Sequence, residues 1–218
     1  MLYYNIMVDT MVRAPAAHVR LASHPGVLRS ILDPAVTLAV WTRPPPAGLI
    51  PAADELAAQG PFCRTVEERP ERLGRTLLDG LDIAPCARTR LAADLARLSR
   101  LFADLLGTTV VRARLEAIHG PACRLFHADW VSLRLLCTYA GAGTEWVPDE
   151  AVDRGRLGDN AAAVPDPAAV RRLPRFAAAI LKGRTWPGNT ERGVVHRSPE
   201  ASPAQPRLLV CLDEPGRG

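Results

Sequence analysis

Residues 124–146 read RLFHADWVSLRLLCTYAGAGTEW, and this stretch decides the fold. His127 and Asp129 lie two residues apart on an expected strand, so both side chains leave the same face of that strand. Mostly apolar segments separated by a glycine-rich turn follow, and they indicate further strands. The expected strands of this stretch cover residues 124–129, 131–140 and 144–147.

Helices are expected before this stretch. In residues 87–106, leucines and Phe102 recur at three- and four-residue steps, and Gly107 follows as a stop, which predicts an amphipathic helix. From Thr109 the apolar period changes to two, which predicts a half-buried strand. Turn formers dominate residues 1–85, where we expect a helical or irregular layer with short helices near 52–59 and 70–80 and one strand at 36–41.

The C-terminal part is expected to add strands at 176–182, 193–197 and 207–212. A long excursion over 148–174, with a short helix near 167–172, is placed to act as a lid, and its deletion is expected to change substrate binding more than stability. These elements predict an α+β fold of one domain, residues 1–218. It would consist of an antiparallel sandwich or barrel over 86–213 with a helical layer from residues 1–85.

Composition narrows the function classes. The chain has 218 residues, 48% of them hydrophobic, and a net charge of +4. Lys182 is the only lysine and the arginines form no basic run, so we expect no nucleic-acid binding. No run of 18 apolar residues suggests a membrane segment, and five irregularly spaced cysteines do not suggest a disulfide framework. The expected location is the cytoplasm.

His196 supplies the third element of a candidate metal site. It ends a short apolar strand in GVVHRSP, where an imidazole must be hydrogen-bonded, solvated or ligated. A histidine and an aspartate two residues apart, such as His127 and Asp129, occur often by chance, so this pair alone does not indicate a metal site. Together with His196 they would form a triad of two histidines and one carboxylate, which leaves coordination positions of iron(II) open for other ligands.

The order of these parts resembles the Fe(II)/2-oxoglutarate-dependent oxygenases, over roughly residues 85–213. In that family, HxD lies on one strand of a double-stranded β-helix, a jelly-roll or cupin-like fold, and a distal histidine precedes a basic residue by about ten positions. The resemblance implies that the triad holds iron(II) and that Arg207, which opens RLLVCLD, binds the far carboxylate of 2-oxoglutarate. It also implies hydroxylation of a small-molecule or protein substrate that the sequence does not identify.

This sequence departs from the oxygenase pattern beside Arg207. Many of these enzymes place a serine or threonine two positions after the arginine, whereas Leu209 stands there. Tyr139 or Thr138 is the candidate to supply the missing hydroxyl and so to contact the co-substrate.

At a closer level, CRLFHADWVSLRLLCTYAGAGTEW with HRSP and RLLVCLD resembles an uncharacterised bacterial family, a domain of unknown function. The resemblance implies an association with zinc-responsive genes. It motivates an alternative, a non-catalytic or hydrolytic zinc-binding protein of metal homeostasis. Cys123, four residues before His127, could then be a fourth ligand.

Three further residues are secondary candidates, each with an ordinary alternative. Arg134 could reach the co-substrate or a substrate acid, or it could lie on the solvent face or pair with an acidic neighbour. Arg197 points to the strand face opposite His196 and could anchor a carboxylate, or it could be a surface residue. Glu145 could contact substrate, or it could be a solvated turn carboxylate, which is the expected interpretation. A β-sandwich binding module without metal is a third possibility, and it predicts that His127 and His196 lie far apart.

Overall fold

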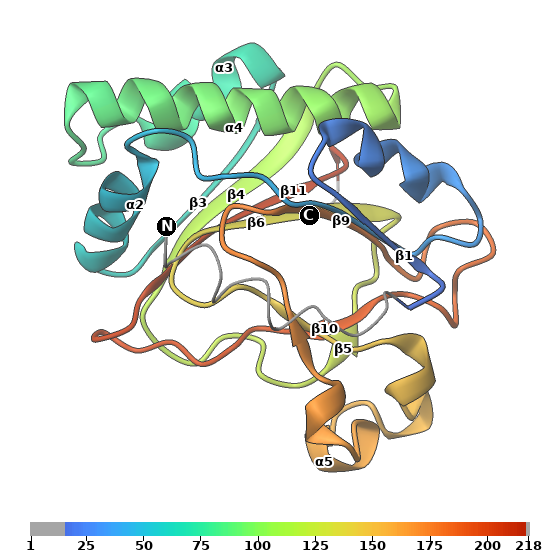
Figure 1. Cartoon of the computed structure of the whole chain (residues 1–218). Helices are drawn as coiled ribbons and strands as arrows, with labels where there is room; N and C mark the ends of the chain where they lie inside the picture. The colour runs from blue at the N-terminus through green and yellow to red at the C-terminus, as the bar shows by residue number, and fades with distance from the viewer. Residues whose placement is uncertain (1–15, 217–218) are drawn as a thin grey trace.

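The computed structural model describes residues 16–216, which form two β-sheets and a layer of helices (Figure 1). The larger sheet has the strand order β1-β2-β9-β6-β11-β4-β3, and the smaller sheet has the order β5-β10-β7-β8. All neighbouring strands are antiparallel except β1 and β2. The larger sheet contains β1 (Val19–Ala22), β2 (Leu38–Trp41), β3 (Phe62–Glu68), β4 (Val111–Ile118), β6 (Leu133–Ala140), β9 (Ala178–Lys182) and β11 (Arg207–Asp213). The smaller sheet contains β5 (His127–Ala128), β7 (Glu145–Trp146), β8 (Arg171–Arg172) and β10 (Val195–Arg197).

Helices cover one face of the larger sheet: α2 (Leu49–Ala58), α3 (Pro70–Leu78) and α4 (Pro85–Leu106), with α4 running across the sheet in Figure 1. The predicted apolar stripe of α4 is buried, since Leu91, Leu95, Leu98 and Phe102 are each at most 1% exposed. Each such side chain contributes about 1.5–3 kcal/mol of burial free energy. The helix ends at Gly107, which has φ 67°, in the left-handed region that glycine adopts without strain.

The first 85 residues contribute more β-structure than expected. Besides β2 they contain β1, which pairs with β2, and β3, which forms the opposite edge of the sheet beside β4. The 3-10 helix η2 (Pro25–Leu32) joins β1 to β2 and buries three side chains. The expectation of a helical or irregular layer was therefore incomplete, because both edge strands of the larger sheet come from this region.

A second apolar core lies between the two sheets. Leu136 of β6, Leu209 and Cys211 of β11 and Trp146 of β7 belong to it, and all are at most 8% exposed. By contrast Leu133, Leu135, Cys137 and Tyr139 of β6 belong to the core under the helices. The larger sheet is thus buried on both faces, and alternate residues of β6 and β11 point towards the smaller sheet.

The excursion between β7 and β9 packs on the smaller sheet. It contains short helical turns, η3 (Asp149–Ala151), η4 (Arg154–Arg156), α5 (Asn160–Ala163) and η5 (Pro167–Ala169), and the strand β8. Ala163 and Val164 form a third apolar cluster with Phe126 and Val195. The side chain of Asn160 accepts a hydrogen bond from the Phe126 amide and donates one to the Arg124 carbonyl. Because the excursion buries apolar residues beside the smaller sheet, its removal would expose them, which does not favour the prediction that deletion changes substrate binding more than stability.

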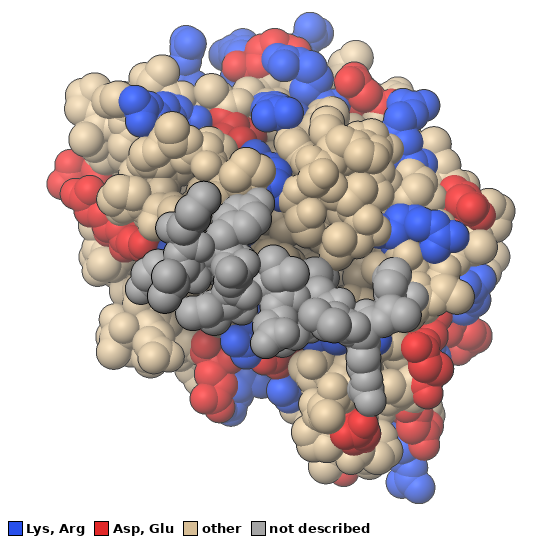
Figure 2. Space-filling model, in the orientation of Figure 1, with Lys and Arg blue, Asp and Glu red and all other residues tan. Residues whose placement is uncertain are grey.

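The described residues include no helix that is long and apolar enough to cross a membrane. On the face shown in Figure 2, basic and acidic side chains are interspersed rather than gathered into one basic surface. All five cysteines are free thiols, and two of them, Cys137 and Cys211, are buried.

Candidate metal centre

Strands β5 and β10 bring the two predicted histidines together. They pair antiparallel with His127 directly opposite His196, and the two imidazole centroids are 4.6 Å apart. Asp129 follows β5 by one residue, and its backbone is held by the turn after β9, where the Arg184 amide donates to the Asp129 carbonyl at 2.8 Å. Gly183 permits this approach, because a Cβ there would lie 2.1 Å from the Val131 carbonyl oxygen.

The three predicted ligands converge. His127 Nε2 lies 3.5 Å from Asp129 Oδ1, and His196 Nε2 lies 3.3 Å from Asp129 Oδ2. Ligand atoms of the three side chains all lie within 4.8 Å of one another. Adjacent ligands of an octahedral ion stand about 3 Å apart when each metal–ligand bond is about 2.1 Å, so only small adjustments would close this set around one ion. The arrangement does not fit the metal-free alternative, which expected the histidines far apart.

Both histidines are oriented by backbone carbonyls. Nδ1 of His127 lies 2.8 Å from the Leu125 carbonyl oxygen, and Nδ1 of His196 lies 3.0 Å from that of Val194. A carbonyl can only accept, so in the neutral rings Nδ1 carries the proton and Nε2 carries the lone pair. The lone pairs therefore face Asp129, which is the tautomer that a metal ligand requires.

Electrostatics keep Asp129 ionised. Burial alone would raise the pKa of Asp129, but its interactions with His127 and His196 and the charge of Arg134 hold that pKa well below the ordinary range. The interaction with Asp129 raises the pKa of His127, against the effect of burial. Asp129 Oδ2 is buried and accepts no well-aligned hydrogen bond, although Arg134 Nη1 lies 2.9 Å away. A buried, ionised carboxylate beside two imidazole nitrogens fits a divalent cation.

Arg207 lies at the start of β11, and its side chain is fully buried. Its Nε donates to the Ala142 carbonyl at 2.6 Å, and Nη1 donates to Ser198 Oγ at 2.5 Å. Nη2 is buried without a hydrogen-bond partner, and no carboxylate among the described residues lies within ion-pair distance of Arg207. Burial lowers the pKa of Arg207 to about 10. A buried, still cationic guanidinium with a free donor fits an anionic ligand such as a carboxylate.

The hydroxyl beside Arg207 comes from Ser198, which the sequence analysis did not single out. Tyr139 does not reach this site: it belongs to the core under the helices, where its hydroxyl donates to Asp94 at 2.7 Å. Thr138 is buried and lies opposite Leu209 in the strand pairing, on the face that points towards the smaller sheet. The sequence feature that could have indicated Ser198 is its position in HRSP, two residues after the distal histidine His196.

Cys123 is exposed and does not belong to the group of potential ligands, so the structure does not favour a four-ligand zinc site that includes it. Glu145 is not a solvated turn residue: it is 8% exposed and accepts from Arg172 at 2.7 Å and from Arg197 at 2.8 Å. Arg197 also stacks over Phe126 at 4.3 Å. These contacts occupy Arg197 on the strand face away from the triad.

Arg134 pairs with acidic neighbours, one of the predicted alternatives, and does not lie on the solvent face. Its Nη1 contacts the carboxylate of Asp129, and its Nε and Nη2 donate to the two oxygens of Asp213. Asp213, the last residue of β11, was not a candidate in the sequence analysis.

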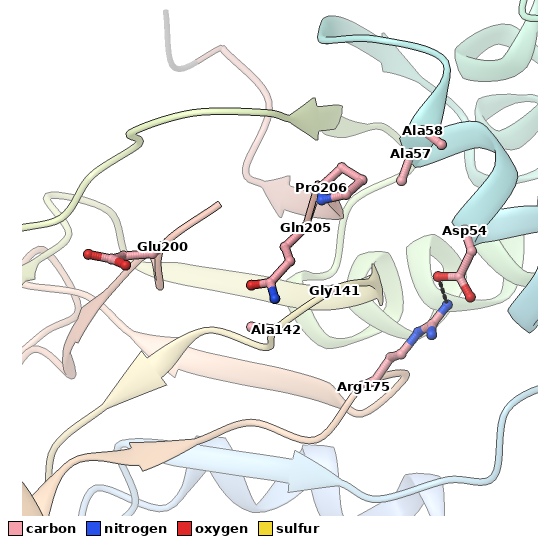
Figure 3. A pocket seen from close by; sticks show the side chains of 9 residues that line it. All are labelled: Asp54, Ala57, Ala58, Gly141, Ala142, Arg175, Glu200, Gln205 and Pro206. Carbon is pink, nitrogen blue, oxygen red and sulfur yellow. Dashed lines mark hydrogen bonds and ion pairs between the residues drawn. The ribbon is translucent and has the colours of Figure 1, made fainter. Parts of the chain in front are cut away.

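Two cavities open near the ends of these strands. One of about 590 Å³ borders Arg207 through Ala142 and Ser198, and Arg124, Arg172 and Arg197 also line it. The other, of about 410 Å³, lies between α2 and the Gly141 turn, where Arg175 pairs with Asp54 (Figure 3). Neither cavity is lined by a triad residue.

Solved structures show what this fold is similar to. The dioxygenase for auxin oxidation 1 from Arabidopsis thaliana, a binary complex with 2-oxoglutarate, matches with a TM-score of 0.54 at 11% identity over 92% of each chain. AviO1 from Streptomyces viridochromogenes matches at 0.46 and 14% identity over 90% of this chain and 98% of that one. A Pseudomonas putida prolyl-4-hydroxylase matches at 0.44 and 12% identity over 87% of this chain and 97% of that one. The first comparison shows that this mixed α/β chain shares its fold with a 2-oxoglutarate-binding dioxygenase.

No curated protein matches the sequence. A family model described as a protein of unknown function, DUF1826, matches residues 22–213. That range includes the helical layer, the smaller sheet, the triad, Arg207 and the larger sheet apart from most of β1. The resemblance to a family of unknown function is therefore confirmed, and the chain belongs to the DUF1826 family.

Proposed function

We propose that this protein is an Fe(II)- and 2-oxoglutarate-dependent oxygenase. The observation that carries the proposal is the pair of features on facing sheets: the triad on the smaller sheet, and the buried, unpaired guanidinium of Arg207 on the larger sheet. The triad alone would fit any divalent-metal protein, and a buried arginine alone would fit many anion sites. Together they provide a ligand set suited to iron(II) and a cation suited to the distal carboxylate of a 2-oxoacid.

The strand order supports a double-stranded β-helix. From β4 onwards, the chain passes back and forth between the sheets: β4, β6, β9 and β11 lie in the larger sheet, and β5, β7, β8 and β10 lie in the smaller one, where β8 follows β7 directly. In this arrangement the HxD segment and the distal histidine occupy neighbouring strands, β5 and β10, and the next strand, β11, crosses back carrying Arg207. This winding of the chain brings the proposed metal ligands and Arg207 onto facing sheets.

When bound, iron(II) and 2-oxoglutarate would supply the chemistry in which O₂ gives one oxygen atom to succinate, with release of CO₂, and one to the hydroxylated substrate. The chain's own residues hold and orient these groups. His127, Asp129 and His196 would provide three ligand atoms to the ion, and the backbone carbonyls at Nδ1 of each histidine would direct its Nε2 to the metal. Arg207 would fix the far end of the co-substrate, and the apolar core around Trp146 and Leu209 would exclude water from it.

A turnover assay without added substrate tests the proposal. Iron(II)-loaded protein with ascorbate and O₂ is expected to convert 2-oxoglutarate to succinate slowly, since many oxygenases of this kind oxidise co-substrate without a prime substrate. Asp129→Ala should abolish succinate formation, because a two-histidine site holds the ion poorly. As a matched control, Asp104→Ala removes an exposed carboxylate of α4, outside the triad and its contacts, and should retain turnover. If the wild-type protein forms no more succinate than the Asp129→Ala variant, the proposal is contradicted.

A further inference from the structure

Arg134 and Asp213 form a salt bridge that is built onto the metal-ligand carboxylate. Arg134 of β6 stands directly opposite Asp213 of β11, and its guanidinium makes two parallel bonds to that carboxylate, at 2.7 and 2.8 Å. The remaining nitrogen, Nη1, lies 2.9 Å from Asp129 Oδ2. One guanidinium thus spans two carboxylates, one of which belongs to the triad.

All three side chains are largely removed from water. Their exposed fractions are 20% for Arg134, 16% for Asp213 and 12% for Asp129. An ion pair at this depth is screened less than a surface pair and has a defined geometry. Because Arg134 is fixed to the central strand β11 by two bonds, the position of its third nitrogen is fixed as well.

The charge balance of this group has a consequence for cation binding. A lone arginine beside a metal ligand would orient the carboxylate but would also repel a divalent cation. Asp213 supplies one negative charge to Arg134 through two hydrogen bonds, so the pair is neutral. The triad therefore keeps the full negative charge of Asp129 while Asp129 is held in place.

We propose that Arg134, held by Asp213, is a positioning residue that fixes the carboxylate of Asp129 for metal binding without reducing the attraction of the site for a cation. This inference rests on the proposed function. The pair would hold Asp129 Oδ2 from behind and leave the carboxylate as a single-oxygen ligand, which preserves the open positions that the co-substrate needs.

Cobalt(II) titration with visible absorption tests the inference, because the spectrum reports coordination geometry as well as affinity. The double variant Arg134→Gln/Asp213→Asn removes the pair without changing net charge. It is expected to raise the cobalt(II) Kd by about 10–100-fold and to alter the spectrum. Asp213→Asn alone leaves Arg134 uncompensated and should also raise the Kd, with a loss that diminishes at high salt.

Arg134→Lys covers the case in which the double variant does not fold. Lysine keeps the charge but has no planar fork, so it cannot span both carboxylates, and the cobalt(II) affinity should still fall. The matched control is Arg114→Gln, which removes an arginine from the neighbouring strand β4. That side chain is 45% exposed and pairs with Glu116 at 3.6 Å, and cobalt(II) binding should remain unchanged.

Wild-type cobalt(II) affinity and spectrum in the double variant, or in Arg134→Lys if only that variant folds, would overturn the inference. An equal loss of affinity in Arg114→Gln would overturn it too, because the effect would then be unspecific. These readouts do not require turnover. A wild-type protein that binds cobalt(II) but forms no succinate would contradict the proposed function alone, whereas one that binds no divalent ion would overturn both.

Discussion

Replacing Arg207 by methionine separates a role in ligand binding from a role in stability. Burial lowers the pKa of Arg207 from the ordinary arginine value to about 10, which at about 1.4 kcal/mol per pKa unit is a cost of about 3 kcal/mol for keeping the guanidinium charged. Because the folded-state pKa of this base is depressed, the cost is fully present below about pH 10, including neutral pH, and disappears as the pH rises towards the ordinary pKa of arginine. Methionine has a similar length and removes this cost.

The substitution also removes two hydrogen bonds, to the Ala142 carbonyl and to Ser198 Oγ. Both residues are half-buried and border a cavity, so water can reach these acceptors and the loss is about 1 kcal/mol each. The two effects nearly cancel. We expect the free energy of unfolding of the metal-free Arg207→Met protein to lie within about 2 kcal/mol of the wild-type value.

Binding of 2-oxoglutarate should respond very differently. Two charge-assisted hydrogen bonds to a carboxylate contribute about 1.5–3 kcal/mol each, so their loss predicts a Kd about 10²–10⁴-fold higher. Urea unfolding of the metal-free protein and calorimetric titration of 2-oxoglutarate into manganese(II)-loaded protein measure the two quantities. Arg43→Met is the matched control, since Arg43 is also buried but is bonded to both oxygens of Asp94. It should destabilise by about 3–5 kcal/mol, because Asp94 would remain buried and uncompensated.

An unchanged 2-oxoglutarate affinity in Arg207→Met would refute the assignment of Arg207 to the co-substrate. A loss of more than about 4 kcal/mol of stability would show instead that the arginine is retained for folding.

The other predictions concern the triad, Cys123 and Tyr139. His196→Ala should raise the cobalt(II) Kd by at least about 100-fold in a spectroscopic titration, because the substitution removes a direct ligand rather than a supporting contact. If the Kd rises less than in Arg134→Lys, the assignment of His196 as a ligand is contradicted. Cys123→Ser should leave the Kd for zinc and for cobalt(II) within about twofold of the wild-type values, since this exposed thiol lies outside the ligand group. Loss of zinc from the variant on equilibrium dialysis would instead support the four-ligand zinc site. Tyr139→Phe should lower the free energy of unfolding by about 1–3 kcal/mol, because the hydrogen bond to buried Asp94 is lost. The affinity for 2-oxoglutarate, measured by calorimetry, should not change. Weaker binding of 2-oxoglutarate would indicate that Tyr139 does contact the co-substrate.

The sequence was most informative where its patterns correspond to a single geometric outcome. The spacing of His127 and Asp129 predicted one shared strand face, and the leucine spacing before Gly107 predicted α4. The convergence of His196 with this pair could not come from spacing, because it depends on the register between β5 and β10. It was inferred from a family resemblance, and the structure brings these side chains together.

The position of Tyr139 shows why the remaining site residues were harder to assign. β6 is apolar on both faces, because one face packs under the helices and the other faces the smaller sheet. Without polar alternation, the sequence does not show which of Thr138 and Tyr139 points inwards. The partner of Arg134 could not be predicted from the sequence either. Asp213 is far from Arg134 in the chain and becomes its neighbour only through the pairing of β6 with β11.

A crystal structure of the protein with manganese(II) and 2-oxoglutarate, collected with anomalous diffraction, tests the central claim most directly. We expect one ion at about 2.0–2.2 Å from His127 Nε2, His196 Nε2 and one oxygen of Asp129, with the distal carboxylate of 2-oxoglutarate on Arg207 Nη2. An ion bound elsewhere, an ion ligated by Cys123, or 2-oxoglutarate that does not contact Arg207 would contradict the account.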